Sequence, residues 1–210
     1  MKPYTSIAIL TIIVVGFFIE SCECLENYYG FSEKVSFWPE NDKILIGDTL
    51  WFYSKINCEK MINTRTGDTV ALCEIPELIN GLGLQKFNID STQSGIAQGA
   101  ISSFNFIGEI GELFTKEDTV YQYCKYEVKN NCYTVLIGII PKKIGKYGIY
   151  VGDPPGVLLS ESGHGCDNRG DFNFEITNAD RHLEILYEFL DGKPISEAIT
   201  VNYYCFEVVN

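Results

Sequence analysis

The sequence predicts a mainly β protein, an antiparallel β-sandwich with one C-terminal amphipathic helix. Three observations lead to this fold class. The chain of 210 residues is rich in aromatic side chains, with 13 Tyr and 13 Phe, and aromatic residues pack well on a pleated sheet. Short apolar stretches recur between turn signals, as in a sandwich. One stretch near the C-terminus has the spacing of an amphipathic helix.

The N-terminal segment predicts export. Lys2 is the only charged residue before Glu20, and the stretch 7–19 is uncharged. A membrane-spanning helix needs about 20 apolar residues, whereas an apolar run of about 7–15 after a basic start is typical of a secretory signal. The letters "IESC", which end at Cys22, resemble the bacterial lipoprotein signal. That resemblance implies cleavage before Cys22 and a lipid on its thiol; the alternatives are a secreted protein cleaved near Ser21 and a retained membrane anchor.

Two acidic residues that follow this cysteine, Glu23 and Glu26, extend the resemblance. They resemble the export signal of Bacteroidota lipoproteins to the outer face of the outer membrane. We therefore expect an exported protein that is lipid-anchored in a bacterial outer membrane and faces the cell surface or the periplasm. The expected organisation is a signal peptide of the lipoprotein type at 1–21, a tether at 22–40 and a single β-sandwich domain at 41–210.

Short strands alternate with turns through most of the expected domain. Gly47-Asp48 predicts a turn between two strands within 43–56. Asn130-Asn131 predicts a hairpin between 118–128 and 132–140. The stretch 74–89 mixes apolar residues with Gly and Pro without a clean period. Further strands are expected near 101–107, 146–153, 172–177 and 198–209.

One amphipathic helix is expected at about 178–191. Thr177 or Asn178 could cap its start and Gly192 its end. The apolar stripe with helical spacing consists of Leu183, Leu186, Tyr187 and Leu190.

Two stretches of the chain resemble immunoglobulin-type domains. "IGDTLWFYS" looks like the turn into their second strand, and "PKKIGKYGIYV" looks like their E–F corner. The family's two cysteines would fall at Ile149 and near Ser54, where this chain has none. The resemblance therefore implies a looser, Ig-like antiparallel β-sandwich. The whole layout also resembles a group of Bacteroidota lipoproteins that implies no known activity.

The eight cysteines of the chain are disulfide candidates if the protein is exported. A lipid on Cys22 would leave an odd number, with Cys24 as the natural unpaired residue in the tether. One pair is favoured, Cys58 with Cys73, around a hairpin-like excursion at 66–68, and Cys166 with Cys205 could tie the C-terminal tail to the preceding loop. A local bridge between Cys124 and Cys132 would need a longer loop than a two-residue turn. The candidates are Cys58, Cys73, Cys124, Cys132, Cys166 and Cys205.

Charge and motifs argue against several functions. The net charge of −12 argues against nucleic acid as a partner, because phosphate contacts need clustered Lys and Arg. The two histidines, His164 and His182, come with no G-x-S-x-G elbow, zinc-site spacing or phosphate-binding loop. We therefore expect no enzymatic activity and no cofactor.

Asp167 and Asp171, in a Gly-rich stretch, are candidate calcium ligands, but the EF-hand order is not met and turn chemistry is favoured.

Aromatic residues are the best candidates for recognition. Tyr121 and Tyr123 share one face of an expected strand by the period of two. They either pack a face of the sandwich or bind a ligand, which would be a protein or a glycan. The alternative functions are a structural, fimbria-like subunit of a surface assembly and a glycan hydrolase that would use a carboxylate pair such as Glu109 and Glu112.

Overall fold

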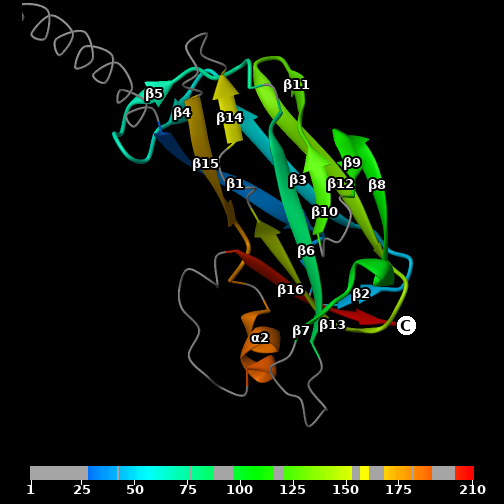
Figure 1. Ribbon diagram of the computed structural model, residues 1–210. Coiled ribbons are helices and arrows are strands. Elements are labelled where there is room, and N and C mark those ends of the chain that lie inside the picture. Colours follow the sequence, from blue (N-terminus) through cyan, green and yellow to red (C-terminus); the bar gives the residue numbers. More distant parts are fainter. Residues whose placement is uncertain are drawn as a thin grey trace, which may run out of the picture.

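The computed structural model shows two curled sheets that share one core (Figure 1). The mainly β, sandwich-like fold class is confirmed. Among the described residues, no helix is long and apolar enough to cross a membrane. The segment 1–21, expected to be a signal peptide, and Cys22 lie outside those residues. The structure describes residues 28–41, 43–75, 77–87, 97–115, 121–152, 157–160, 168–180, 182–190 and 202–210.

The first sheet has seven strands in the order β11-β12-β3-β1-β15-β14, with β8 also paired to β12. Side chains of alternate residues on these strands enter the core, as the period of two requires. Phe172, Phe174 and Ile176 do so on β15, as the sequence predicts. The strands are β1 (Tyr28–Trp38), β3 (Leu50–Asn57), β8 (Phe104–Ile110), β11 (Glu127–Lys129), β12 (Cys132–Pro141), β14 (Val157–Ser160) and β15 (Asn168–Ile176).

The second sheet also has seven strands, in the order β2-β16-β13-β6-β10-β9, with β7 paired to β6. Its inner face meets the first sheet: the ring of Phe37 on β1 lies 4.7 Å from that of Tyr204 on β16. The strands are β2 (Lys43–Leu45), β6 (Ile79–Phe87), β7 (Ala97–Gly99), β9 (Glu112–Phe114), β10 (Tyr121–Lys125), β13 (Gly145–Gly152) and β16 (Tyr203–Val209). A short 3-10 helix, η2 (Ile101–Ser103), precedes β8, and β4 (Met61–Ile62) with β5 (Thr69–Val70) forms a separate two-stranded sheet.

The predicted hairpin at Asn130-Asn131 is confirmed. Both residues have positive φ, 51° and 56°, and Lys129 pairs with Cys132 across the two-residue turn. The expected strand 118–128 is divided, however. Its first part, β10, belongs to the second sheet, and its last part, β11, belongs to the first. The chain therefore crosses between the sheets at Tyr126, whose side chain is buried.

Two features of the expected organisation are wrong. The tether at 22–40 contains β1, a strand inside the first sheet whose Phe31, Val35 and Phe37 are buried. Burial of these three side chains stabilises the strand, although Glu33 interrupts the row of apolar residues in the sequence. The sheets are also not purely antiparallel, because β1 runs parallel to β15 and β2 runs parallel to β16.

The helix is shorter than expected. α2 spans Leu183–Phe189, and His182 before it has a φ of 62°. The described residues 178–180 form a turn and not the start of the helix. The side chain of Asn178 binds β1 instead of capping the helix: it accepts a hydrogen bond from the Phe37 N–H and donates one to the Phe37 carbonyl. The buried stripe also differs from the expected one, because Tyr187 is exposed. Its buried residues are Ile185, Leu186 and Phe189.

The corner before β13 has the hydrogen bond found at the E–F corner of immunoglobulin-type domains. The hydroxyl of Tyr147 donates to the carbonyl of Lys143, 3.0 Å away. Ile149 and Ser54, where the family's cysteines would stand, are buried on different sheets. A closer relation to that family stays a prediction.

Glu33 is a carboxylic acid on the inner face of β1. It lies between Phe31 and Val35 in the row of core-facing residues, opposite Phe174 of β15. Its side chain is half-buried, and desolvation raises the pKa of the carboxyl from 4.5 to about 7. The folded protein therefore holds this proton more tightly than the unfolded chain.

This difference predicts a stability that falls with pH. Below the unfolded pKa of 4.5 the carboxyl is protonated in both the folded and the unfolded state. As the pH rises from 4.5 to about 7, the unfolded chain gives up the proton more readily than the folded protein, so the free energy of unfolding falls. We expect Glu33→Gln to raise the free energy of unfolding by about 1–2 kcal/mol above neutral pH, a value discounted for solvent screening, and to change little in acid. Urea denaturation at both pH values measures this. Glu109→Gln, at an exposed position on β8, is the control; equal effects of Glu33→Gln at both pH values would contradict the assignment.

Candidate functional site

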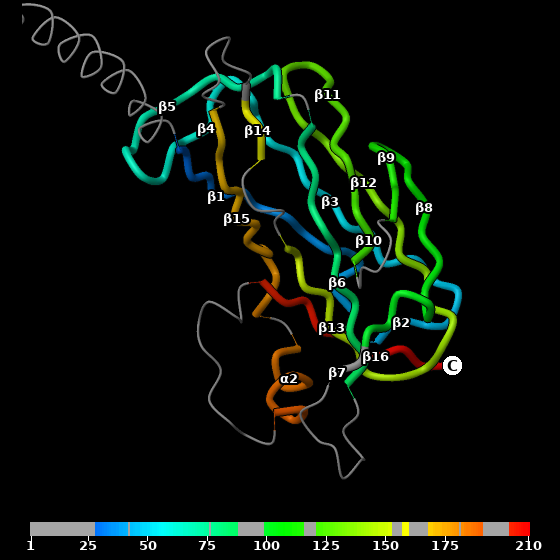
Figure 2. The backbone as a smooth tube through the Cα atoms, viewed as in Figure 1, coloured from blue at the N-terminus to red at the C-terminus, as the bar shows by residue number. Residues whose placement is uncertain are grey.

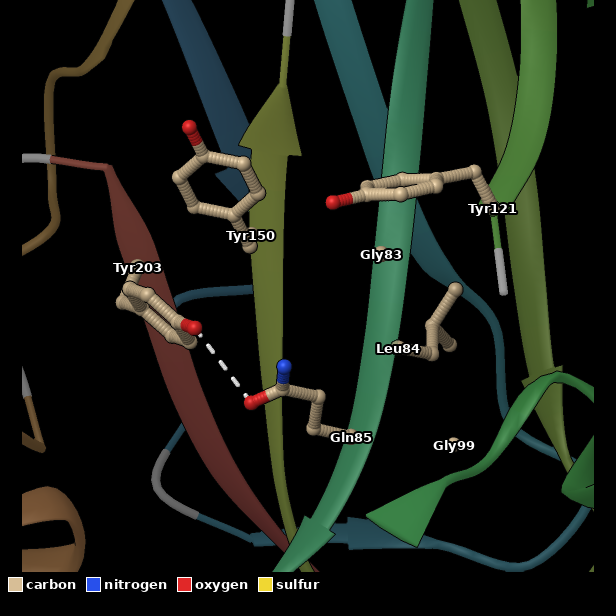
Figure 3. Close-up of a pocket in the computed structure, with 7 residues that line it drawn as sticks. All are labelled: Gly83, Leu84, Gln85, Gly99, Tyr121, Tyr150 and Tyr203. Carbon is tan, nitrogen blue, oxygen red and sulfur yellow. Dashed lines mark hydrogen bonds between the residues drawn. The ribbon is translucent and has the colours of Figure 1, made fainter. Parts of the chain in front are cut away.

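The outer face of the second sheet carries a pocket of about 500 Å³. It lies over β6, β13 and β16, with β10 on one side and β7 at one end (Figure 3). We call it the tyrosine pocket. Its lining residues are Gly83, Leu84, Gln85, Gly99, Tyr121, Tyr150 and Tyr203.

The strand register places the three tyrosines in one row. Tyr203 on β16 pairs with Tyr150 on β13, Tyr150 pairs with Gly83 on β6, and Gly83 pairs with Tyr121 on β10. Directly paired residues point to the same face of a sheet. Four strands that are distant in sequence therefore place three phenol rings and one glycine, Gly83, in a single row across the sheet.

Gly83 leaves a gap in this row. On β6, Leu82 and Leu84 are fully buried, and the alternate positions Gly81 and Gly83 face outward. A Cβ at Gly83 would lie 2.8 Å from Cε1 of Tyr121, and a Cβ at Gly81 would lie 3.2 Å from Cδ1 of the same ring. Glycine at these positions is what allows the Tyr121 ring to approach the backbone and leaves a floor of main chain in the pocket.

Hydrogen bonding fixes one side of the pocket. The hydroxyl of Tyr203 donates to Oε1 of Gln85 over 3.3 Å, and Figure 3 shows the Gln85 amide nitrogen turned toward the space between Tyr121 and Tyr150. Burial raises the pKa of the Tyr203 phenol, and the nearby hydroxyls of Tyr121 and Tyr150 and the thiol of Cys205 raise it further, whereas the bond to Gln85 lowers it. The phenol therefore stays protonated at neutral pH.

The helix α2 packs on the outer face of the second sheet, next to the pocket. Ile185, Leu186 and Phe189 of α2 pack with Phe87 and Cys205 on the outer face of the second sheet, and Tyr203 packs against this cluster. The stacked rings of Phe87 and Phe189 are 4.6 Å apart. The helix thus covers one part of the outer face and holds Tyr203 in place beside the uncovered part.

Of the two tyrosines predicted to face a ligand, one lines the pocket. Tyr121 does so, whereas Tyr123 stacks on Phe114 of β9, with ring centroids 5.5 Å apart. Tyr123 also contacts the Tyr121 ring at 6.1 Å, so it buttresses the pocket wall. The period of two predicts the same role for Tyr121 and Tyr123, but in the structure Tyr121 lines the pocket and Tyr123 packs behind it.

Sequence reasoning missed most of the pocket. Neither Tyr203 nor Gln85 is among the predicted site residues, because Tyr203 lies in an apolar closing strand and the stretch 74–89 has no clean period. A signal was present in the letters "GLGL", residues 81–84, where leucine and glycine alternate. Such alternation indicates a strand with one face in a core and a bare outer face.

The cysteines confirm one predicted disulfide. Cys58 and Cys73 are bonded, around the predicted excursion that β4 and β5 form. Cys124, Cys132 and Cys205 carry free thiols, so bridges from Cys124 to Cys132 or from Cys205 to Cys166 are wrong as pairings. The reason is geometric: Cys124 and Cys132 belong to different sheets, and Cys205 is buried beneath α2, where burial raises its thiol pKa to about 12. Cys166 itself lies outside the described residues.

The remaining predicted residues are not brought to the tyrosine pocket. Asp171 lies on β15, where it accepts a hydrogen bond from the Tyr28 hydroxyl at 2.5 Å and lies 3.9 Å from the Arg65 guanidinium. A guanidinium beside the carboxylate disfavours a calcium ion there. Asp167 is outside the described residues. Glu109 and Glu112 are both exposed, on β8 and β9.

No protein family model matches the chain, and a search of curated proteins finds no match to its sequence.

Proposed function

We propose that the protein is an exported, lipid-anchored recognition module without enzymatic activity of its own, and that the tyrosine pocket is its binding site. One observation carries the proposal: the row of Tyr203, Tyr150 and Tyr121 around the backbone floor at Gly83. Ligand sites are typically concave, of about 300–1,000 Å³, with aromatic walls and few polar groups. The pocket volume of about 500 Å³ falls in this range.

The chemistry of the lining supports binding over catalysis. Acid–base catalysis needs a group whose pKa lies near the working pH. The titratable groups that line the pocket are phenols, and the pKa of Tyr203 is raised above the ordinary value of 10. Protonated phenols donate and accept hydrogen bonds to a ligand but are poor general bases at neutral pH.

The disulfide supports the proposed location. Structural disulfides persist in oxidising compartments and are rare in the cytosol of most organisms. The bond between Cys58 and Cys73 therefore favours export. A lipid on Cys22 would attach the protein to the bacterial outer membrane six residues before β1 begins at Tyr28.

A role as a surface-assembly subunit is the alternative that one strand favours. β8 has seven residues, and in the described part of the chain it pairs with β12 alone. Edge strands of this kind can accept a strand from another chain. The pocket proposal does not require such pairing, so the oligomeric state of the purified protein distinguishes the two functions.

Replacing pocket tyrosines should abolish recognition. We expect the full-length protein in detergent to bind probes on an array that carries neutral and acidic polysaccharides together with peptides, and Tyr121→Ala and Tyr150→Ala to weaken that binding about tenfold or more. Tyr187→Ala, at a position on α2 that is 45% exposed, is the matched control and should bind normally. Undiminished signal in both pocket variants, or no signal on any probe, would overturn the proposal.

A further inference from the structure

We infer that the ligand of the tyrosine pocket is a neutral carbohydrate. The inference rests on the proposed function and adds the class of ligand. The lining combines three phenols and one carboxamide with glycine backbone and one leucine, and it includes no carboxylate, ammonium or guanidinium group. Each polar group in it is therefore a neutral donor, acceptor or both.

An anionic ligand is disfavoured by charge. Burying a carboxylate or phosphate requires a cation or several donors to replace its water. Two lysines of the surrounding strands are already engaged, because Lys146 lies 2.5 Å from Glu188 and Lys125 lies 3.5 Å from Glu77. The third, Lys86 on β6, alternates with Gln85 and pairs with the core residue Tyr147, so it points to the other face of the sheet. The chain as a whole has a net charge of −12, which repels anions at longer range.

A cationic ligand is disfavoured by the orientation of the rings. Aromatic cages for quaternary ammonium groups present ring faces to the cation. In Figure 3 the hydroxyls of Tyr121 and Tyr203 point inward over β6 and β13, and the Tyr203 hydroxyl is hydrogen-bonded to Gln85. Converging hydroxyls and an amide are suited to a ligand that carries several hydroxyls of its own.

The spacing of the row fits a sugar ring. Tyr150 and Tyr121 lie on strands separated by β6, so their Cα atoms are about 10 Å apart. The Tyr121 ring covers Gly83, where a Cβ would lie 2.8 Å from its Cε1. A six-membered sugar ring would therefore lie beside that ring, in the space that Tyr121, Tyr150, Tyr203 and Gln85 surround in Figure 3, within van der Waals contact at about 4 Å. The hydroxyls of the sugar would meet the inward-pointing hydroxyls of Tyr121 and Tyr203 and the Gln85 amide, and its C–H groups would meet the ring edges.

Calorimetry on the full-length protein in detergent tests the ligand class. The probes are three neutral tetrasaccharides (of β-linked glucose, β-linked mannose and α-linked glucose), oligogalacturonate as the acidic match, and choline as the cation. We expect at least one neutral tetrasaccharide to bind about tenfold or more tighter than either charged probe. Tyr203→Phe, which keeps the ring and removes the hydroxyl that holds Gln85, should weaken this binding about three- to tenfold, while Tyr187→Phe should leave it unchanged.

Failure of the inference differs from failure of the proposed function. Preferred binding of oligogalacturonate or choline, or of array peptides alone, with loss of that binding in Tyr121→Ala, would overturn the neutral carbohydrate as the ligand and leave the recognition module intact. The absence of binding by all three neutral probes would also overturn it. Equal neutral-sugar binding by wild type, Tyr121→Ala and Tyr203→Phe would place the sugar elsewhere and overturn both.

Discussion

Replacing Gly111 with alanine is expected to lower the free energy of unfolding by about 3 kcal/mol. Gly111 connects β8 of the first sheet to β9 of the second, two strands that are neighbours in Figure 2. It lies against Lys125, the residue before the point where the chain returns to the first sheet at Tyr126. Its φ is +88°, and a Cβ there would lie 2.4 Å from the carbonyl oxygen of Lys125 and 3.2 Å from Cγ2 of Val135. The change therefore adds a clash with backbone to an unfavourable conformation. Chemical denaturation followed by circular dichroism measures the loss.

Gly47→Ala is the matched control for this substitution. Gly47 has nearly the same φ, +89°, but a Cβ there would have nothing within 4 Å. It should lower the free energy of unfolding by about 1 kcal/mol, the cost of the backbone conformation alone. Equal losses at Gly47 and Gly111 would contradict the prediction, because they would show that the backbone at Gly111 and at Lys125 can move apart without a cost in free energy.

Local features of the fold were predictable from the sequence. The turn at Asn130-Asn131 is encoded by two adjacent residues that tolerate positive φ, and the excursion around Gly67 by a run of turn residues. The disulfide that closes this excursion followed from its short span, because residues near in sequence need little loop closure to meet. Each of these features depends on interactions within a short segment.

Strand partners were not predictable in the same way. β1 lies in the stretch that the sequence predicts to be a tether, and its partners β15 and β3 are set by packing with Phe172 and Phe52. The parallel pairing of β1 with β15 joins residues that are about 140 positions apart, as between Tyr28 and Arg169. Sequence periodicity describes the faces of a strand but carries no information on its neighbours.

The same limit applies to the tyrosine pocket. Tyr121 could be proposed from its own strand, since it alternates with buried Gln122. Its meeting with Tyr150 and Tyr203 depends on the registers of three strand pairs. A one-residue shift in any of them would move a ring to the core face, so the pocket exists only at the level of the assembled sheet.

Loss of the bond between Cys58 and Cys73 is expected to lower the free energy of unfolding by about as much as Gly111→Ala does. The cysteines are separated by 15 positions, and closing such a loop in the unfolded chain corresponds to about 3 kcal/mol. The double variant Cys58→Ala/Cys73→Ala should unfold at a temperature about 10 °C lower, as judged by calorimetry. Reduction of the wild-type protein should give the same loss without a change of side chain. Cys132→Ala, which removes a free thiol, should have little effect.

The folded loop should keep its structure after this loss, because other contacts hold it. The Thr64 N–H donates to the Gly30 carbonyl over 2.7 Å, the Gly30 N–H donates to Oδ1 of Asn63, and Met61 is buried in the core. The bond therefore acts mainly on the unfolded chain, and the double variant should bind the ligand of the tyrosine pocket normally while it is folded. Protein made in a reducing cytoplasm should be less stable by the same amount and should recover on oxidation. Equal stability of the reduced and oxidised forms would show that the bond does not restrict the unfolded chain, and would remove the disulfide as support for export.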